Sequence, residues 1–435
     1  NVGIGSYVLE NLTTGTDNVA IGFVAGRRIT GTYNVSIGSY AHDYGYVSTK
    51  SIAIGYQSAQ YSTGSNNTFV GYQAGRGGTN SAPYSSGGNN TAIGYQALDS
   101  FTSGDSNNAI GYQAGYLISS GSNNTVMGYQ AGYSLGGTVM NVMIGDYAGR
   151  SSRVINNRQV FVGHSAGRYV DTGVANVAIG WHAMESANSS TDNNANNNVA
   201  VGYQALEKIT DADANTAVGK EAGQNITTGN QNTFIGNNAG QYSVTSAQNV
   251  MVGLSAGLAA TDVDRTVLMG WNAGRNTTAD GTIAIGWEAG YSLTSGIGNT
   301  VIGYEALETE DTGTGTVAIG YHAAKAQNGN GKNVSIGYQA SMNGHEGEKN
   351  VIIGYQAGLS VGGHTWSKNV GIGNNALYKI QGGSEDNVVI GDSAGFNSLT
   401  VTGNTLLGSS AGSAITTGDY NVAIGFQSMD AGTTI

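Results

Sequence analysis

Apolar and polar positions recur along the whole chain with a period that is mostly 17 residues. A glycine preceded by Ile, Val, Leu or Met occurs 25 times, from Gly5 to Gly425, and we call it the anchor glycine. A β-branched residue stands two places before that aliphatic residue in nearly every copy, as Val19 stands before Ile21. Period-two alternation and β-branching predict a short strand, not a helix. Longer copies contain local insertions that keep the phase of the repeat.

The strand is apolar at almost every position, as in Asn18-Val19-Ala20-Ile21-Gly22. Strands that are apolar on both faces are usually buried on both faces. We expect the aliphatic column to fill the coil interior, and its members include Ile21, Ile54, Ile285 and Ile353. The alternate column, with Ala20 and Ala284, would then face a partner chain. This assignment predicts that Ile285→Asp unfolds coils and that Ala284→Asp separates chains. A trimer or a dimer would satisfy the argument, and we expect a trimer.

Two further columns predict ladders of like residues between stacked coils. Asn stands four places before the anchor glycine in 20 copies, including Asn18, Asn67, Asn124, Asn232, Asn350 and Asn421. An aromatic residue follows the anchor glycine in 15 copies, including Tyr72, Tyr95, Tyr112 and Tyr355. Aromatic faces also bind sugars, but such regular recurrence favours a structural stack.

A corner of small residues follows the strand, and a weaker apolar column seven places after the anchor glycine predicts a second, less regular strand. Strand, corner, short strand and turn in about 17 residues form one coil of a β-solenoid. We therefore predict an all-β chain, with residues 1–435 forming a single continuous parallel β-solenoid, or β-roll, of about 25 coils. At about 4.8 Å per coil, the rod would be on the order of 120 Å long.

The repeat units resemble those of a known family. Units such as Asn90-Thr91-Ala92-Ile93-Gly94-Tyr95-Gln96-Ala97-Leu98 are similar to the head repeats of trimeric autotransporter adhesins. They resemble the repeat arrays of phage tail fibre proteins still more closely. The resemblance implies a left-handed roll, a tight parallel homotrimer and adhesion at a distance from the bearing surface. The coils are longer than the usual head repeat, and Asn and Tyr-Gln stand where Ser is often found. Stalk, membrane anchor, signal peptide and chaperone segments are not recognisable, so we expect a fragment or a processed part of a longer fibrous protein.

Composition narrows the function classes. Of 435 residues, 71 are Gly, one is Pro and none is Cys, and only 10% are charged, unlike ordinary enzymes. The lack of cysteine excludes a disulfide scaffold and a thiolate metal site. A net charge of −11 disfavours nucleic acid as a partner, and no apolar run is long enough to insert this segment into a membrane. We predict no enzymatic activity and no cofactor.

Candidate catalytic or metal-binding residues are few. The densest acidic group comprises Glu305, Glu308, Glu310 and Asp311, where a solvated acidic turn is favoured over a glycosidase pair. Six histidines show no close pair at metal-ligand spacing, and His182 and His322 occupy a column that usually holds Gln. Calcium could bind at turns with Asp211 and Asp213 or Asp262 and Asp264, but neither turn follows a recognised loop pattern. We therefore predict no metal site.

Recognition is more readily sought in the irregular loops, because insertions in solenoids often cluster on a binding face. The loops span Arg76–Gly88, Ser186–Asn197 and Gly362–Lys368, and their candidate recognition residues are Arg76, Tyr84, Asp192 and Trp366. Loops without a binding role are an equally good interpretation.

The leading functional hypothesis is a rigid trimeric shaft of a phage tail fibre involved in host attachment, extracellular and part of the virion. Its cell-surface receptor is unknown, with glycans among the candidates. The alternative is a bacterial cell-surface adhesin or extracellular filament that binds host or matrix. An ice-binding solenoid is weaker because flat arrays of Thr are absent from the repeat, and a polysaccharide-degrading tailspike is the enzymatic outsider.

Overall fold

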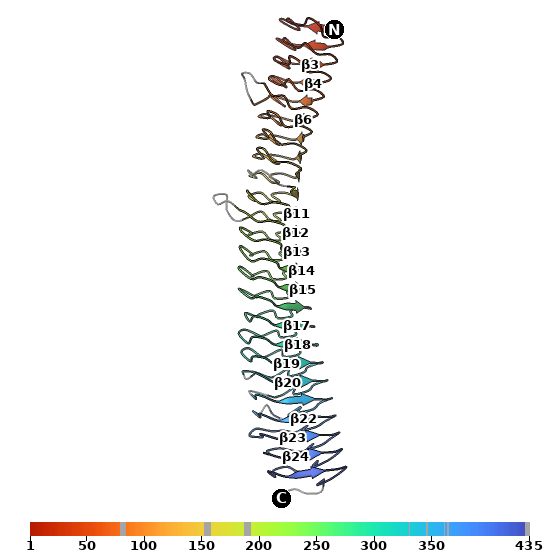
Figure 1. Cartoon of the computed structure of the whole chain (residues 1–435), viewed down its shortest axis with the longest axis vertical. Helices are drawn as coiled ribbons and strands as arrows, with labels where there is room; N and C mark the ends of the chain where they lie inside the picture. The colour runs from red at the N-terminus through yellow and green to blue at the C-terminus, as the bar shows by residue number, and fades with distance from the viewer. Residues whose placement is uncertain are drawn as a thin grey trace. The chain divides into compact units, whose positions relative to one another are not determined.

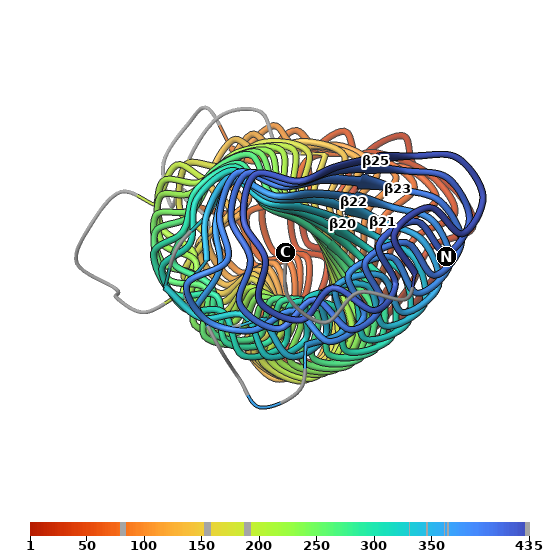
Figure 2. The same cartoon turned by 90° about the horizontal axis from the view of Figure 1, so that it is seen from below.

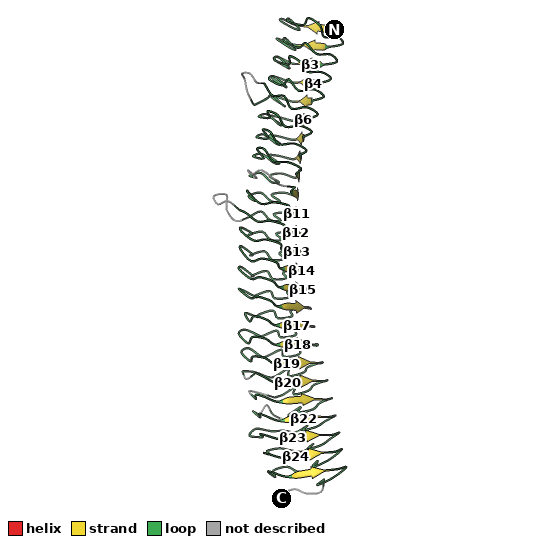
Figure 3. Ribbon diagram, in the orientation of Figure 1, coloured by secondary structure: helices red, strands yellow, loops and turns green. Residues whose placement is uncertain are grey.

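The protein is all-β over the residues that the computed structural model describes, which are 1–78, 84–151, 158–186, 193–329, 331–344, 347–360, 362 and 365–430. These residues form 25 strands of three residues each and no helix. Figure 3 shows short strands joined by long stretches of loop and turn.

The chain divides into two compact units, and the same coil builds both. The first comprises Asn1–Glu221 and Asn225–Thr228, and the second comprises Ala222–Gln224 and Gly229–Ile435. The strands of the first are β1 (Val2–Ile4), β2 (Val19–Ile21), β3 (Val35–Ile37), β4 (Ile52–Ile54), β5 (Thr68–Val70), β6 (Thr91–Ile93), β7 (Asn108–Ile110), β8 (Thr125–Met127), β9 (Val142–Ile144), β10 (Val160–Val162), β11 (Val177–Ile179), β12 (Val199–Val201) and β13 (Thr216–Val218). Those of the second are β14 (Thr233–Ile235), β15 (Val250–Val252), β16 (Val267–Met269), β17 (Ile283–Ile285), β18 (Thr300–Ile302), β19 (Val317–Ile319), β20 (Val334–Ile336), β21 (Val351–Ile353), β22 (Val370–Ile372), β23 (Val388–Ile390), β24 (Thr405–Leu407) and β25 (Val422–Ile424).

Within each unit, every strand pairs in parallel with the strand of the next coil, at the same repeat position. In the first unit, β6 pairs with β7 through Thr91 and Asn108, Ala92 and Ala109, and Ile93 and Ile110. In the second unit, β17 and β18 pair in the same way. The labelled strands follow one another coil by coil in Figure 1, and β20 to β23 and β25 lie along one side of their coils in Figure 2. The predicted parallel β-solenoid is confirmed, and its left-handed sense stays a prediction.

The two faces of the strand are reversed relative to the prediction. The middle residue of every strand from β2 to β25 is buried in the coil, as Ala20 and Ala284 are, whereas Ile21 and Ile54 are each 36% exposed. Ile285 and Ile353 lie in the same outward column and are half-buried. Period two separates the faces of a strand but does not say which face is inside, and here both columns are apolar. The prediction of an inward aliphatic column was therefore wrong.

The predicted second strand is also wrong, although its apolar column is buried. Ile118 and Leu135 are core residues, but Ile118 forms only an isolated parallel bridge with Gly136, and Leu135 lies in irregular structure. In the corner before them, every second residue has a left-handed backbone conformation: Gln113 has a φ of 51° and Gly115 has a φ of 60°. The hydrogen bonds between coils nevertheless continue, because the Gln113 amide donates to the carbonyl oxygen of Tyr95 at 2.8 Å. The corner stacks as regularly as the strand without being extended.

The core is filled by two columns of complementary size. In several coils, a large inward strand residue faces a glycine four places after the anchor glycine, as Phe69 faces Gly75 and Phe234 faces Gly240. A Cβ on Gly75 would lie 2.5 Å from the Phe69 ring. Where the inward strand residue is small, the other column is often large, and the pairs include Ala92 with Leu98, Ala178 with Met184 and Ala200 with Leu206. The coil thus keeps a similar interior volume, as close packing requires.

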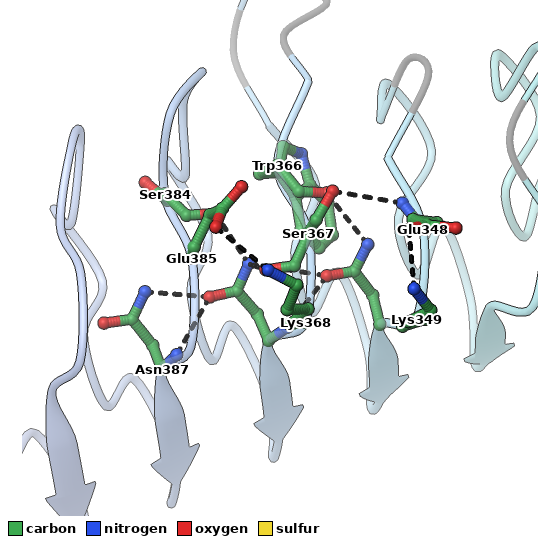
Figure 4. A network of polar contacts seen from close by, with 10 residues as sticks. Glu348, Lys349, Trp366, Ser367, Lys368, Ser384, Glu385 and Asn387 are labelled. Carbon is green, nitrogen blue, oxygen red and sulfur yellow. Dashed lines mark hydrogen bonds and ion pairs between the residues drawn. The ribbon is translucent and has the colours of Figure 1, made fainter.

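The predicted Asn ladder is present and buried. The Asn124 side chain donates through Nδ2 to Asn107 Oδ1 at 3.0 Å and to the Thr138 carbonyl oxygen at 2.9 Å. Its own Oδ1 accepts from the Asn141 amide at 3.1 Å. An equivalent bond joins Asn387 Nδ2 to Asn369 Oδ1 at 2.8 Å, and Figure 4 shows Asn387 in this network of polar contacts. The remaining predicted members make ladder bonds as well, with Asn421 the half-buried last one: Asn18, Asn67, Asn232, Asn350 and Asn421.

Candidate functional site

Each unit exposes apolar side chains at the same positions of successive coils. The third strand residue and the aromatic residue after the anchor glycine both point out of the coil, so Ile93 is 40% and Tyr95 42% exposed. We call these positions the outward stripe. Other members are Ile21, Phe23, Ile54, Tyr56, Ile179, Trp181 and Tyr203 in the first unit, and Ile235, Trp287, Ile302, Tyr304, Tyr355 and Leu407 in the second. Contiguous apolar surface of this kind is typical of an interaction site.

The aromatic column of the stripe stacks ring on ring. The Tyr72, Tyr95 and Tyr112 rings are nearly parallel, with centroids 5.1 and 5.0 Å apart. Tyr355 continues a second stack, 5.3 Å from Tyr338. Because each ring face lies against the next ring, the stack presents ring edges to solvent instead of the open faces on which sugars stack. This geometry supports the structural interpretation of the column.

A ladder of Gln side chains accompanies the tyrosine stack. Gln96 Nε2 donates to Gln73 Oε1 at 2.8 Å, and Gln113 Nε2 donates to Gln96 Oε1 at 2.9 Å. These residues follow the tyrosines directly, at left-handed backbone positions. Successive coils that carry the Tyr-Gln pair are therefore joined by two parallel ladders, one of stacked rings and one of hydrogen-bonded amides.

Arg76, predicted to serve recognition, is engaged in an ion pair with the next coil. Its Nη2 lies 2.8 Å from Asp99 Oδ2, and the Asp99 side chain is fully buried. Burial raises the pKa of Asp99 to about 6, although the Arg76 guanidinium opposes the shift. The contact fixes Arg76 to the next coil, while 32% of its side chain remains exposed.

Tyr84 packs into a cluster of four tyrosines. Its ring centroid lies 5.2 Å from Tyr44, 5.6 Å from Tyr46 and 6.4 Å from Tyr61. The Arg28 guanidinium lies over the Tyr44 ring at 4.1 Å. Tyr46 is exposed and the other three rings are half-buried, so the cluster lies at the surface of the first unit.

The other two recognition candidates have different outcomes. Trp366 is only 2% exposed and belongs to the core of the second unit, beside Ile352 and Leu377. The prediction that Trp366 is a recognition residue was wrong, because the indole fills the interior of its coil. Asp192 lies outside the described residues.

Three carboxylates of the acidic group in the second unit, those of Glu305, Glu308 and Glu310, are held by neighbouring groups. Lys325 Nζ contacts Glu305 and also lies 3.0 Å from Glu308 Oε2. Although partial burial opposes the shift, the hydrogen bond from Lys325 lowers the pKa of Glu305. Glu310 is buried, and its Oε1 accepts from the Gly313 amide at 2.7 Å and the Gly329 amide at 2.8 Å. These contacts fit a structural role better than a glycosidase pair.

Aspartates in the turns accept hydrogen bonds from the preceding coil. Asp213 Oδ1 accepts from the Asn196 amide at 2.8 Å, and Asp264 Oδ1 accepts from the Ala247 amide at 2.8 Å. Asp262 Oδ1 accepts from Thr245 Oγ1 at 2.7 Å. Three of the four carboxylates considered for calcium, those of Asp213, Asp262 and Asp264, therefore join coils.

The structure brings together three side chains that could ligate a metal ion, a group that the sequence prediction missed. One ligand atom each from His182, Glu185 and Glu207 lies within 4.8 Å of the others, and all three side chains are half-buried. His182 Nδ1 contacts Glu185 Oε2 and lies 4.0 Å from Glu207 Oε1. Glu185 and Glu207 stand five places after consecutive anchor glycines, so in-register stacking makes them neighbours. That column position was the signal available in the sequence.

Comparisons with known proteins add no family: no protein-family model matches the chain, and a search of curated proteins found no similar sequence. Among the described residues, no helix has the length and apolar character needed to cross a membrane. The functional argument therefore depends on the geometry of the repeat.

Proposed function

We propose that this chain forms the rigid, non-enzymatic shaft of a homotrimeric fibre that attaches a phage tail to its host. The observation that carries the proposal is the outward stripe, which recurs at the same position of successive coils in both units. Hydrogen bonds between coils run through strand, corner and Asn ladder alike, and this continuity favours a stiff element over a mobile one. The similarity of the repeat unit to phage tail fibre arrays supports the same assignment.

The period of the stripe favours another copy of this chain as its cover. Apolar residues recur once per coil, so a partner can bury them along the whole stripe only if its own apolar residues have the same spacing. An identical chain in parallel orientation meets that condition. The choice of three copies instead of two follows from the family resemblance, because the stripe itself fits either number.

Extracellular binding by the shaft itself is the second candidate, as in a bacterial surface adhesin or filament. The tyrosine cluster around Tyr84 favours it, since half-buried and exposed aromatic rings beside Arg28 are a common surface for glycans. The receptor would then contact the coils of the first unit.

Light scattering of the native particle tests the assembly. A mass of three chains of 44.3 kDa each is expected for the wild type. Ile302→Asp places a carboxylate in the outward stripe, and it should shift the mass toward single chains while the circular dichroism spectrum is retained. A monomeric wild type would overturn the trimeric shaft, and a two-chain mass would retain the fibre but refute the trimer.

A glycan array separates the two candidates. The purified chain should leave the array unlabelled if it is a shaft that carries a separate tip. Binding that is lost in Tyr84→Ala and kept in Tyr7→Ala, a tyrosine outside the cluster, would favour the adhesin. Release of reducing ends from any polysaccharide would contradict a non-enzymatic role.

A further inference from the structure

We propose that His182, Glu185 and Glu207 form a binding site for one divalent transition-metal ion, with zinc as its simplest probe. The three ligand atoms lie within 4.8 Å of one another, close enough for a single ion to contact all of them. All three residues belong to the first unit of one chain. The site is therefore independent of the proposed fibre and of its number of chains.

The repeat itself creates the site. Glu185 and Glu207 occupy the same column of adjacent coils, where like charges facing each other are destabilising. His182 replaces the usual Gln two places after its anchor glycine, at a φ of 54° that matches the φ of Gln204 in the next coil. An imidazole nitrogen is thereby added beside two stacked carboxylates. Arg168 offsets part of the charge of Glu185 through Oε1, and a bound cation would relieve the repulsion that remains.

Neighbouring side chains orient the two carboxylates. Gln204 Nε2 donates to Glu207 Oε1 at 2.6 Å, and Arg168 Nη1 lies 3.4 Å from Glu185 Oε1. Hydrogen bonds to ligating groups from a second layer of residues are a regular feature of metal sites. Glu185 presents its other oxygen, Oε2, to His182.

The site has space for further ligands. A surface depression of about 350 Å³ adjoins the carboxylates, and its lining residues are Tyr169, Glu185, Ser186, Glu207 and Lys208. Three protein ligands with an open side give the arrangement in which zinc keeps a water molecule or takes an exchangeable ligand. One nitrogen and two carboxylate oxygens also suit other first-row divalent ions, including manganese and cobalt.

A second histidine in the same column provides the matched control. His322 Nε2 lies 3.0 Å from Glu305 Oε2, so an imidazole and a carboxylate also meet there. In that coil, Lys325 Nζ contacts both Glu305 and Glu308 and already supplies a positive charge between them. The His322 group should therefore bind zinc much more weakly than the His182 group.

Isothermal titration of the full chain, prepared without a histidine tag, with zinc ions tests the proposal. The wild type should bind one zinc ion per chain at a saturable site. His182→Gln should weaken that binding at least tenfold, and Glu207→Gln should weaken it similarly. His322→Gln should leave it unchanged. His182→Gln restores the residue that most coils carry, so the coil should remain folded, as circular dichroism would verify.

Two results would overturn the site. One is the absence of saturable binding of zinc, manganese or cobalt to the wild type at millimolar concentrations. The other is equal affinity of the wild type and His182→Gln. If the second result were accompanied by a loss of binding in His322→Gln, the ion would be assigned to the other histidine.

Discussion

Asn side chains of the ladder bond both to backbone groups and to the Asn of a neighbouring coil, as Asn124 bonds to Thr138 and Asn107, and this explains why the column holds Asn so consistently. The short side chain is an acceptor for one coil and a donor to another, and Thr or Ser can replace only part of that set. The ladder was predictable because its residue type recurs at a fixed position.

Asn124→Ala should destabilise the first unit. It removes the side-chain bonds to Asn107 and Thr138 and leaves the buried Asn141 amide without its acceptor, at a cost of about 2–3 kcal/mol. Urea unfolding followed by circular dichroism measures the effect. Thr125→Ala, at the outward neighbouring position, should cost less than about 1 kcal/mol, and equal losses in the two variants would contradict the ladder's role.

His42 makes the stability of the first unit sensitive to acid. Burial lowers the pKa of His42 to about 4 from its ordinary value near 6.5. The unfolded chain therefore binds a proton between pH 6.5 and 4 that the folded chain does not, and stability should fall across that window by up to about 1.4 kcal/mol per pH unit. Asp99, whose pKa is raised, acts in the opposite direction between about pH 4 and 6.

The variant His42→Leu isolates this effect. Leu98 occupies the same coil position with a φ of 52°, close to the 55° of His42, so leucine should fit there. The difference in urea midpoint between the wild type and His42→Leu should grow as the pH falls from 7 to 5. A difference that does not change with pH would show that His42 is protonated equally in both states.

At the scale of the element, the coil interior is shared between two columns whose sizes compensate. The sequence contained this signal, since Phe69 and Gly75 or Ala92 and Leu98 can be read as opposed pairs. It was not recognised because the strand's inward face had been assigned to the wrong column. The left-handed corner could not be predicted either. Gln113 and Tyr147 have a positive φ there, and a positive φ is uncommon for residues other than glycine.

A double-mutant cycle tests the compensation. Phe234→Ala should cost about 3–5 kcal/mol through the cavity it leaves. Gly240→Leu should also destabilise, because its Cβ would lie 2.3 Å from the Phe234 ring. Combined, the two changes reproduce the small-large pairing of Ala92 and Leu98, so the double variant should be more stable than Phe234→Ala. Additive losses in urea unfolding would argue against a shared volume.

At the scale of the whole molecule, substitutions on the two apolar faces of the strand should have different effects: those on the inward face should affect folding, and those on the outward face should affect assembly. Ala284→Asp buries a charge inside a coil and should lower the free energy of unfolding by more than about 3 kcal/mol. Ile285→Asp, on the outward face, should leave the fold intact and reduce the particle mass. Unfolding and light-scattering measurements on both variants give the comparison. Unfolding by Ile285→Asp with tolerance of Ala284→Asp would contradict the observed orientation.

The architecture was predictable from the sequence, whereas the candidate metal site was not. The shared column of Glu185 and Glu207 predicts that these two residues are neighbours, but it does not predict that His182, which stands in another column, joins them. Their convergence depends on which columns lie side by side on the coil surface. Trp366 illustrates the same limit, because an insertion loop offers no period from which to infer that an indole turns inward.

The ladder and register contacts join a coil only to the coils directly before and after it. The contacts between neighbouring coils therefore do not fix the total number of coils. Recombination between like copies, such as loss of residues 92–108, would remove one whole repeat and restore every neighbouring bond, whereas a loss out of phase would break them. Recombination during evolution could therefore add or remove single repeats. The number of coils would change while the structure of each coil stays the same.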